Sequence, residues 1–355
     1  MMEYKVYKWS DVLTIINGRN QNAVECEDGE YPIYGSGGVM GKANDYLCPP
    51  NCTIIGRKGN INKPIYVETK FWNVDTAFGL SANEEILNPR YLYYFCVDYN
   101  FERHNKAVTI PSLTKADLLK IEMCLPPLDK QKSIVGELDK INELIRLKRE
   151  QLKDYDNLAQ SIFYEMFGDK KYERCKLKNI VKVKSGQVSP LEDPYCDMVH
   201  VGPANIESNT GRLINLKTAK EENLISGKYL FNSSMVLYSK IRPNLNKVTI
   251  ADFEGICSAD MYPLIPSKSI DKKFLLFILK QKEFLSYAIA NSGRANIPKI
   301  NREALLEYST ILPPLSLQLQ FAERLALIEQ QKAEIQNTIA DLETLLASRM
   351  QYWFD

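Results

Sequence analysis

The sequence has few of the residues that most often carry chemistry. It contains two histidines in 355 residues, and its eight cysteines form no CxxC pair and have no histidine at metal-ligand spacing. The closest pair, Cys48 and Cys52, flanks two prolines. A structural zinc site needs four nitrogen or sulfur ligands brought together by such spacings. We therefore expect reduced thiols and no bound metal.

Long apolar runs are also absent. The longest, from Phe274 to Leu279, is far shorter than the ~20 residues that cross a bilayer, and the charged start of the chain is unlike a signal peptide. With 45% hydrophobic and 25% charged residues, the composition is that of an ordinary folded protein. We expect a cytoplasmic protein.

Two common enzyme motifs are missing. No GxxxxGK[ST] phosphate loop occurs, and the GSGG at Gly35 to Gly38 lacks the lysine that such a loop requires. The proline pairs are followed by Asn51, Leu128 and Leu315, which does not fit the [DNS]PP[YFW] motif of an adenine methyltransferase. We expect neither ATP hydrolysis nor methyl transfer by this chain.

The charge is nearly balanced at +1 overall, but it is unevenly distributed. Residues 172 to 312 carry 20 basic and 14 acidic side chains, whereas residues 1 to 125 carry 13 and 15. The excess of positive charge in the later segment favours contact with phosphates there.

One pattern occurs twice, 187 positions apart. Leu125 to Gln131 reads LPPLDKQ and Leu312 to Gln318 reads LPPLSLQ, and each opens a segment with heptad spacing. Such spacing keeps one face of a helix against a partner helix, so each copy predicts a coiled-coil helix. The predicted seam residues are Leu138, Ile141, Ile145, Lys148, Leu152, Tyr155, Ala159, Ile162 and Met166, with Phe321, Leu325, Ile328, Lys332, Ile335, Ile339, Leu342, Leu346, Arg349 and Trp353 in the second copy.

The repeat predicts two globular heads, each followed by a long helix. Asp129 and Ser316 are expected to cap the helix starts, because a short side-chain oxygen can accept from the unpaired N–H groups there. Short β-branched runs bounded by Gly, Pro or Asn predict mixed α/β heads with small sheets, including residues 52–55, 65–67, 235–238 and 247–250. The predicted domains are a first head at residues 1–125, a spacer helix at 126–168, a second head at 169–312 and a spacer helix at 313–355.

Two heads that each end in an LPPL junction and a heptad helix resemble the specificity subunit of Type I restriction-modification enzymes over nearly the whole chain. The heads are similar to the target-recognition domains of that family through YPIYGSGG (31–38), IIGRKGNINKP (54–64), FWNVDTA (71–77) and VHVGPANI (199–206). One departure is NSSMV at residues 232–236, where many relatives carry a Gly-Asp-Val type of turn.

The resemblance implies a non-catalytic reader of double-stranded DNA. Each head would read one half of a bipartite target from the major groove, while the two helices would pack antiparallel as a spacer. Two modification subunits would dock on the chain and methylate adenines, and two restriction subunits could join them. S-adenosylmethionine, ATP and Mg would belong to those partners, and this chain would bind no cofactor.

Base edges are read by Arg, Lys, Asn, Gln and Ser side chains on loops and by close backbone approach at glycine. These rules select two loops that follow predicted strands, together with several flanking positions. The candidate DNA-binding residues are Ser36, Gly37, Gly38, Arg57, Lys58, Asn60, Asn62, Lys63, Ser185, Gln187, Asn205, Ser239, Lys240, Arg242, Asn244, Asn246, Lys247, Gly293, Arg294 and Asn296. For Arg57, an ordinary surface position is an equally good interpretation.

Three further expectations concern residues that could be mistaken for binding groups. His200 is expected to be a structural histidine. Trp9, Trp72 and the tyrosine-rich segment 91–99 are expected to pack in the core, because base stacking belongs mainly to single strands.

The alternative functions that stay open are a self-sufficient DNA methyltransferase or nuclease, and a coiled-coil scaffold that does not bind DNA.

Overall fold

The computed structural model describes residues 4–105, 111–168, 172–293 and 296–354. The candidate Arg294 therefore lies outside the described residues. Within the described ranges, no helix is both long enough and apolar enough to cross a membrane.

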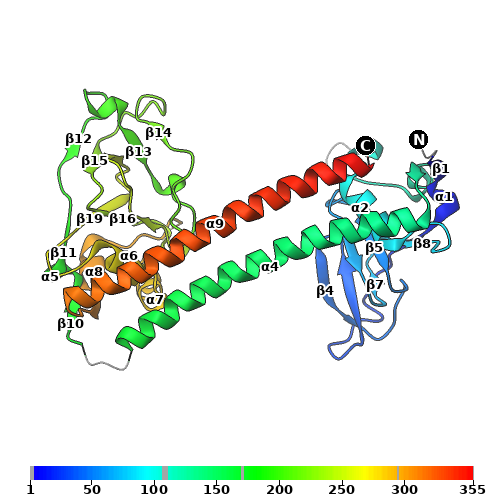
Figure 1. Ribbon diagram of the computed structural model, residues 1–355, viewed down its shortest axis with the longest axis horizontal. Coiled ribbons are helices and arrows are strands. Elements are labelled where there is room, and N and C mark those ends of the chain that lie inside the picture. The colour runs from blue at the N-terminus through cyan, green and yellow to red at the C-terminus, as the bar shows by residue number, and fades with distance from the viewer. Residues whose placement is uncertain (1–3, 106–110, 169–171, 294–295, 355) are drawn as a thin grey trace. The chain divides into compact units, whose positions relative to one another are not determined.

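The chain forms two compact units, and each unit contains parts of both long helices. Unit 1 comprises Met1–Gln151 and Ile335–Asp355, and unit 2 comprises Leu152–Glu334. Helix α4 spans Leu128–Phe167 and helix α9 spans Leu315–Phe354, so both cross from one unit into the other (Figure 1). These units divide the helices themselves, and the predicted domain boundaries at residues 125, 168 and 312 stay a prediction.

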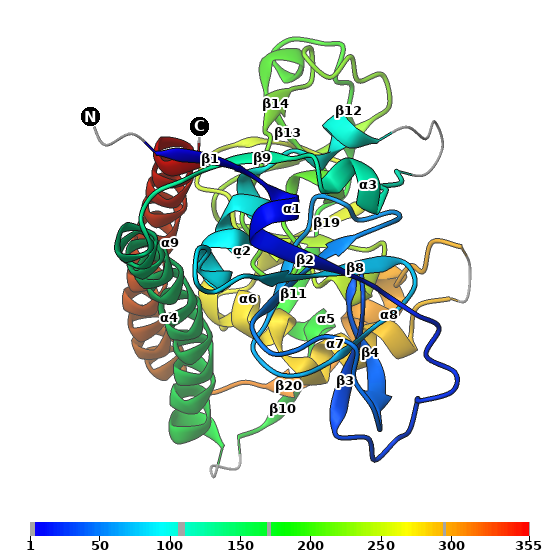
Figure 2. The same ribbon diagram turned by 90° about the vertical axis from the view of Figure 1, so that its right-hand side faces the viewer.

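The head of unit 1 is a mixed α/β structure, as predicted. Its strands form a four-stranded sheet in the order β2-β8-β5-β6, a three-stranded sheet β4-β3-β7, and the antiparallel pair β1-β9, whose strands lie side by side in Figure 2. The elements are β1 (Lys5–Lys8), α1 (Trp9–Val12), β2 (Leu13–Asn17), β3 (Tyr31–Gly35), β4 (Gly38–Ala43), β5 (Cys52–Gly56), β6 (Ile65–Val67), β7 (Trp72–Asn73), β8 (Ala77–Ala82), α2 (Pro89–Asp98), η1 (Phe101–His104), α3 (Lys115–Leu118) and β9 (Glu122–Leu125).

The head of unit 2 repeats part of this plan and enlarges the rest. It has a four-stranded sheet β11-β19-β16-β17, a five-stranded sheet β12-β15-β18-β13-β14 and the pair β10-β20. The elements are β10 (Arg174–Lys176), α5 (Leu177–Ile180), β11 (Val181–Val183), β12 (Gln187–Val188), η2 (Tyr195–Asp197), β13 (Val199–Val201), η3 (Pro203–Asn205), β14 (Lys217–Thr218), β15 (Lys228–Phe231), β16 (Val236–Ser239), η4 (Pro243–Leu245), β17 (Val248–Thr249), β18 (Gly255–Cys257), β19 (Met261–Pro266), α6 (Lys272–Lys280), α7 (Lys282–Ala290), α8 (Arg302–Glu307) and β20 (Ser309–Ile311).

The four-stranded sheets of the two heads are equivalent. Strands β2, β8, β5 and β6 occupy the same order as β11, β19, β16 and β17, and every neighbouring pair is antiparallel. The predicted strands at 52–55, 65–67, 235–238 and 247–250 are β5, β6, β16 and β17. The duplication therefore extends through the whole of this sheet, while the second sheets differ in strand number.

The core of each head is aromatic and aliphatic. Trp9 and Trp72 are buried, as are Tyr91 and Tyr94 from the tyrosine-rich segment, which confirms their predicted packing role. The ring of Trp9 meets Phe95 and Phe101 edge-on, at centroid distances of 6.2 and 6.0 Å. Edge-to-face geometry suits the quadrupoles of aromatic rings.

The two long helices begin one residue earlier than their predicted caps. Asp129 and Ser316 lie at the second helical position, inside the first turn, so the prediction that they act as N-caps is wrong. The first backbone bonds of α4 run from the N–H groups of Lys130 and Gln131 to the carbonyl of Pro127. Proline fixes φ near its helical value, so the helix can start at the proline pair itself.

Within each unit the two helices run antiparallel. In unit 1, Arg149 pairs with Glu343 at 2.6 Å, and Glu137 pairs with Arg349 further toward the start of α4. In unit 2, Lys332 lies 2.9 Å from Asp156. The predicted seam residues Leu138, Ile141, Ile145, Phe321, Ile328 and Ile335 are buried.

The last phenylalanine of each helix packs on the head at which the other helix begins. The ring of Phe354, at the end of α9, lies 5.1 Å from Tyr91 of α2 in unit 1. The ring of Phe167, at the end of α4, lies 5.4 Å from Phe274 of α6 in unit 2. Each head therefore holds the start of its own helix and the end of the other helix.

Candidate nucleic-acid interface

The first predicted loop leaves the central strand of unit 1. Every residue of β5 is buried, and the chain then emerges as the exposed segment Arg57 to Asn60. The carbonyl of Arg57 accepts from the N–H of Leu113 at 2.9 Å, and the N–H of Gly59 donates to the carbonyl of Pro111 at 3.1 Å. Pro111 and Leu113 therefore hold this loop in place.

The second predicted loop is built in the same way. Strand β16 is buried throughout, and the loop after it is held by the segment around Pro298. The carbonyl of Lys240 accepts from the N–H of Ile300 at 3.0 Å, and the N–H of Arg242 donates to the carbonyl of Pro298 at 2.7 Å. Pro298 and Ile300 lie 187 positions after Pro111 and Leu113, so the two loops are equivalent elements of the two heads.

The equivalence shows where the heads differ in chemistry. Gly59 and Arg242 occupy the same loop position, and both have a left-handed backbone, with φ of 78° and 48°. A left-handed conformation favours glycine, so an arginine there is unusual. At this position the loop of unit 2 carries an exposed guanidinium on a well-fixed backbone, whereas the loop of unit 1 has a glycine without a side chain.

The structure leaves most of the predicted residues accessible. The hairpin turn of Ser36 to Gly38 also lies beside the first loop, because a Cβ on Gly37 would sit 3.9 Å from the Asn60 amide nitrogen. In unit 2, Ser185 and Gln187 are exposed and lie on or next to β12, an edge strand of the five-stranded sheet. The exposed candidates are Gly37, Arg57, Lys58, Asn60, Asn62, Lys63, Ser185, Gln187, Arg242, Asn244, Gly293 and Asn296.

Four candidates have polar groups that are used inside the protein. Asn205 is buried; its oxygen accepts from the N–H of Gly202, and its amide donates to the carbonyls of Ile214 and Asn215. Ser239 and Asn246 are also buried, and they donate to the carbonyls of Ile241 and Lys280. Asn62 is exposed, but its amide bridges Asn100 and the N–H of Phe101. These four side chains support the loops from within the protein.

Two lysines of the second loop also turn inward. The ammonium of Lys240 donates to the carbonyl of Ala259 and lies 3.8 Å from Asp260, and burial, with the nearby Lys299, lowers the Lys240 pKa. The ammonium of Lys247 donates to the carbonyl of Pro203 at 2.7 Å. Arg242 and Asn244 are therefore the side chains of this loop that point to solvent.

One exposed cation near the second loop was not predicted. Lys299 pairs with Ile241 across an isolated bridge and is exposed. Its position follows the Ile-Pro pair and aligns with Ser112 at offset 187, so the repeat could have identified it. It adds positive charge beside Arg242.

One pair of equivalent cations in the two heads is structural. Lys115 donates to the carbonyl of Ile15 at 2.7 Å, and Arg302 donates to the carbonyl of Val183 at 3.3 Å. Lys115 and Arg302 are 187 positions apart and occupy equivalent helices, α3 and α8. Both anchor the strand that opens the four-stranded sheet.

His200 is a core residue of the second head, in agreement with the expectation of a structural role. Its Nδ1 lies 2.7 Å from a carboxylate oxygen of Glu222, while its Nε2 is buried without a hydrogen-bond partner among the described residues. Burial lowers the pKa of His200, although the Glu222 carboxylate acts in the opposite direction.

The duplicated heads, their equivalent exposed loops and the antiparallel helix pair define the class of two-headed proteins built by internal duplication. The family model for the Type I restriction modification DNA specificity domain matches residues 1–154 and 169–344. The chain belongs to this family.

Two similar curated proteins carry specificity-subunit names. The chain is 24% identical to the Type I restriction enzyme EcoDI specificity subunit of Escherichia coli, over 98% of this chain and 87% of that protein. It is 22% identical to the Type I restriction enzyme MjaVIII specificity subunit of Methanocaldococcus jannaschii, over 92% of this chain and 86% of that protein.

Two solved structures share the fold. The Type I restriction-modification system S subunit from M. genitalium superposes with a TM-score of 0.62 at 14% identity, covering 99% of this chain and 96% of that one. A chain from a study of complex assembly and conformational transition of the type I R-M system superposes with a TM-score of 0.57 at 15% identity, covering 99% of this chain and 97% of the other.

Proposed function

We propose that this chain is a non-catalytic DNA reader in which each head recognises one half of a bipartite target. The observation that supports this most directly is the pair of equivalent loops, 57–60 and 240–244, each fixed at its base by backbone hydrogen bonds, to residues 111–113 and 298–300 respectively. A fixed backbone with exposed Arg, Lys and Asn side chains is what base-edge and phosphate contacts require.

The helices would set the gap between the two half-sites. Each has 40 residues, which at a rise of ~1.5 Å gives a length of about 60 Å. One turn of duplex DNA measures about 34 to 36 Å, so a helix pair of this length can serve heads that bind a turn or more apart. Because each head is joined to both helices, a change in helix length would change the gap and leave the half-site sequences alone.

The catalytic work would belong to partner subunits. We propose that two methyltransferase (modification) subunits dock on the helices and methylate the target, and that two restriction subunits can join them. In this proposal S-adenosylmethionine, ATP and Mg are bound by those subunits and none of them by this chain.

Selection of bound duplexes from a random pool, using the chain co-purified with its modification subunits, tests the reading of two half-sites. The expected result is a motif of two short sequences separated by a fixed unspecified gap. Replacing Arg57 and Lys58 by alanine should change one of the two sequences and keep the other and the gap. A single continuous motif would contradict the proposal.

A preparation of the chain without its partner subunits separates the alternatives. A self-sufficient methyltransferase or nuclease would modify or cut duplex DNA as the purified chain alone with cofactor. A coiled-coil scaffold would show no duplex affinity even at low salt, where phosphate contacts are strongest.

A further inference from the structure

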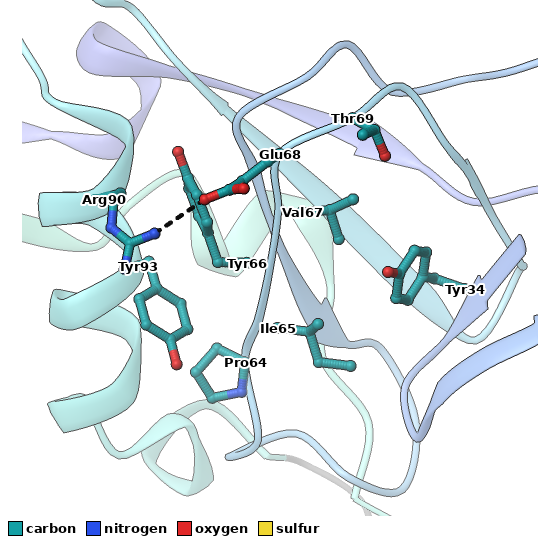
Figure 3. A pocket seen from close by; sticks show the side chains of 9 residues that line it. All are labelled: Tyr34, Pro64, Ile65, Tyr66, Val67, Glu68, Thr69, Arg90 and Tyr93. Atoms are coloured by element: carbon teal, nitrogen blue, oxygen red, sulfur yellow. Dashed lines mark hydrogen bonds and ion pairs between the residues drawn. The ribbon is translucent and has the colours of Figure 1, made fainter. Parts of the chain in front are cut away.

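The edge of the four-stranded sheet in unit 1 borders a hollow that no described part of the chain fills. Strand β6 pairs with β5 on one side and ends the sheet order on the other. Beside it lies a hollow of about 560 Å³, lined by Tyr34, Pro64, Ile65, Tyr66, Val67, Glu68, Thr69, Arg90 and Tyr93 (Figure 3). Six of these nine residues are consecutive and include the whole of β6, so the hollow runs along an edge strand.

Edge strands carry backbone N–H and C=O groups that natural proteins usually cover or protect. In unit 2 the equivalent edge is covered by the chain itself. The carbonyl of Val248 in β17 lies against the backbone of Gly211, because a Cβ on Gly211 would come within 2.3 Å of that oxygen. Gly211 has a φ of 75°, and the carbonyl of the preceding Thr210 accepts from the Lys280 ammonium at 2.6 Å.

The corresponding position of unit 1 is open. The pairing of Ile54 with Ile65 matches that of Leu237 with Thr249, so Pro64 takes the place of Val248. Pro64 lines the hollow, and Ile65 and Tyr66 are only half-buried, whereas Val248 and Thr249 are buried. One head therefore covers this edge with its own loop, and the other leaves it available.

The side chains around the hollow favour a positively charged occupant. Glu68 has a side chain that is 72% exposed, and within the described residues one of its two oxygens is paired, with Arg90 at 3.3 Å. The Arg90 charge is already shared with Asp139 at 2.6 Å. Two carboxylates thus surround one guanidinium, and DNA phosphates would be repelled.

The aromatic rings add a second preference for a cation. Tyr66 and Tyr93 lie 5.8 Å apart, and Figure 3 shows both beside Arg90 and Glu68 at one end of the hollow. The Arg90 guanidinium already lies over the Tyr66 ring at 5.0 Å, so this ring accepts a planar cation. Tyrosine faces attract Lys and Arg side chains, and the attraction strengthens as water is excluded.

We infer that the edge of β6 is a docking site for an extended basic segment of the modification subunit, which adds as a strand and places a Lys or Arg side chain in the hollow. Strand addition of this kind uses backbone bonds for affinity and side-chain pockets for specificity. The inference rests on the proposed function, because it assigns the segment to that partner. It also implies that only one of the two docked subunits uses this contact.

The first test measures where the modification subunit touches the chain. A photo-crosslinking amino acid is placed at Thr69, which is exposed at the hollow, in the full chain co-expressed with that subunit. Mass spectrometry of the cross-linked product should identify a modification-subunit peptide that contains Lys or Arg near the linked residue. Cross-links only to DNA, to a second copy of this chain or to an acidic peptide would overturn the assignment.

The second test uses charge reversal. Glu68→Lys should weaken binding of one modification subunit at least tenfold and leave the other unchanged, which titration calorimetry or native mass spectrometry can resolve. Glu27→Lys makes the same charge change at another exposed position of unit 1 and should stay within twofold of the wild type.

The two tests also distinguish this inference from the function on which it rests. If Glu68→Lys and Glu27→Lys assemble alike while the wild type binds two subunits, the docking site is wrong and the proposed function stands. If the wild type binds no modification subunit, both are wrong.

Discussion

Gln131 accepts a hydrogen bond from the backbone N–H of Asn88 at 2.8 Å, which joins the first turn of α4 to the N-cap of α2. The same side chain donates to the carbonyls of Ile86 and Pro126, both at 2.9 Å, and it is fully buried. In unit 2, Gln318 accepts from the N–H of Asp271 at 2.9 Å, and Asp271 caps α6. The final glutamine of each LPPL junction thus fixes a long helix to its head.

Gln131→Ala should destabilise unit 1 by roughly 2 to 4 kcal/mol, because it leaves the buried carbonyl of Pro126 and two half-buried groups, the Asn88 N–H and the Ile86 carbonyl, without this partner. Urea unfolding followed by a probe in unit 1 measures the loss. Gln336→Ala, at an exposed position of α9 that also belongs to unit 1, is the matched control and should change stability by less than ~0.5 kcal/mol. Equal effects of the two substitutions would contradict the role assigned to Gln131.

Arg242→Ala should relax or abolish recognition of one half-site at a cost of about 1 to 3 kcal/mol, while the other half-site and the gap persist. The left-handed backbone adds a useful comparison, because Arg242→Gly removes the side chain and suits a φ of 48°. Methylated-base mapping in cells that express each variant measures recognition.

Both Arg242 variants should lose the same half-site if the guanidinium is the reading group. Arg212→Ala, at an exposed arginine of unit 2 that is paired with Glu207, should leave the motif intact. If Arg242→Ala weakens binding equally for all sequences, its contact is with phosphate.

The sequence alone predicts the helices and the duplication well, because offset 187 is kept from the Ile-Pro pair to the ends of the helices. It does not reveal the equivalence of the sheets. Gly56 and Ser239 end equivalent strands, but the offset between them is not 187, and the residues around them are too dissimilar to align. Hydrogen bonds to Pro111 and Pro298 make the match visible.

The candidate site is only partly predictable, for a reason that Asn205 and Lys240 illustrate. A polar residue on a loop looks the same in sequence whether it faces solvent or an internal carbonyl. The fold turns the Lys240 ammonium toward Ala259 and the Asn205 amide toward Ile214, and neither partner is a neighbour in sequence. Arg242 differs because the rigid Pro243 and the hydrogen bond to the Pro298 carbonyl fix its backbone, while its side chain is exposed.

Insertion of four residues after Leu152 and four after Ile339 should lengthen both helices by about 6 Å, close to two base pairs. Insertion in both helices keeps the antiparallel seam paired on either side of the change. The expected result in methylated-base mapping is a longer gap with unchanged half-site sequences. An unchanged gap would show that the helices do not set the spacing.

The burial of His200 predicts a pH dependence of stability in unit 2. Its folded pKa is lowered below its unfolded value by burial, so the unfolded chain binds a proton first as the pH falls. The stability contributed by the neutral ring is therefore fully present above the ordinary histidine pKa of about 6.5 and is lost progressively below it. Urea unfolding between pH 7.5 and 5.5, followed in unit 2, should show this decline.

His200→Asn should flatten the decline, because an amide can still donate to Glu222 and does not titrate in this range. His104→Asn, in unit 1, is the control and should keep the wild-type slope for unit 2. An identical slope in all three proteins would assign the decline to other groups.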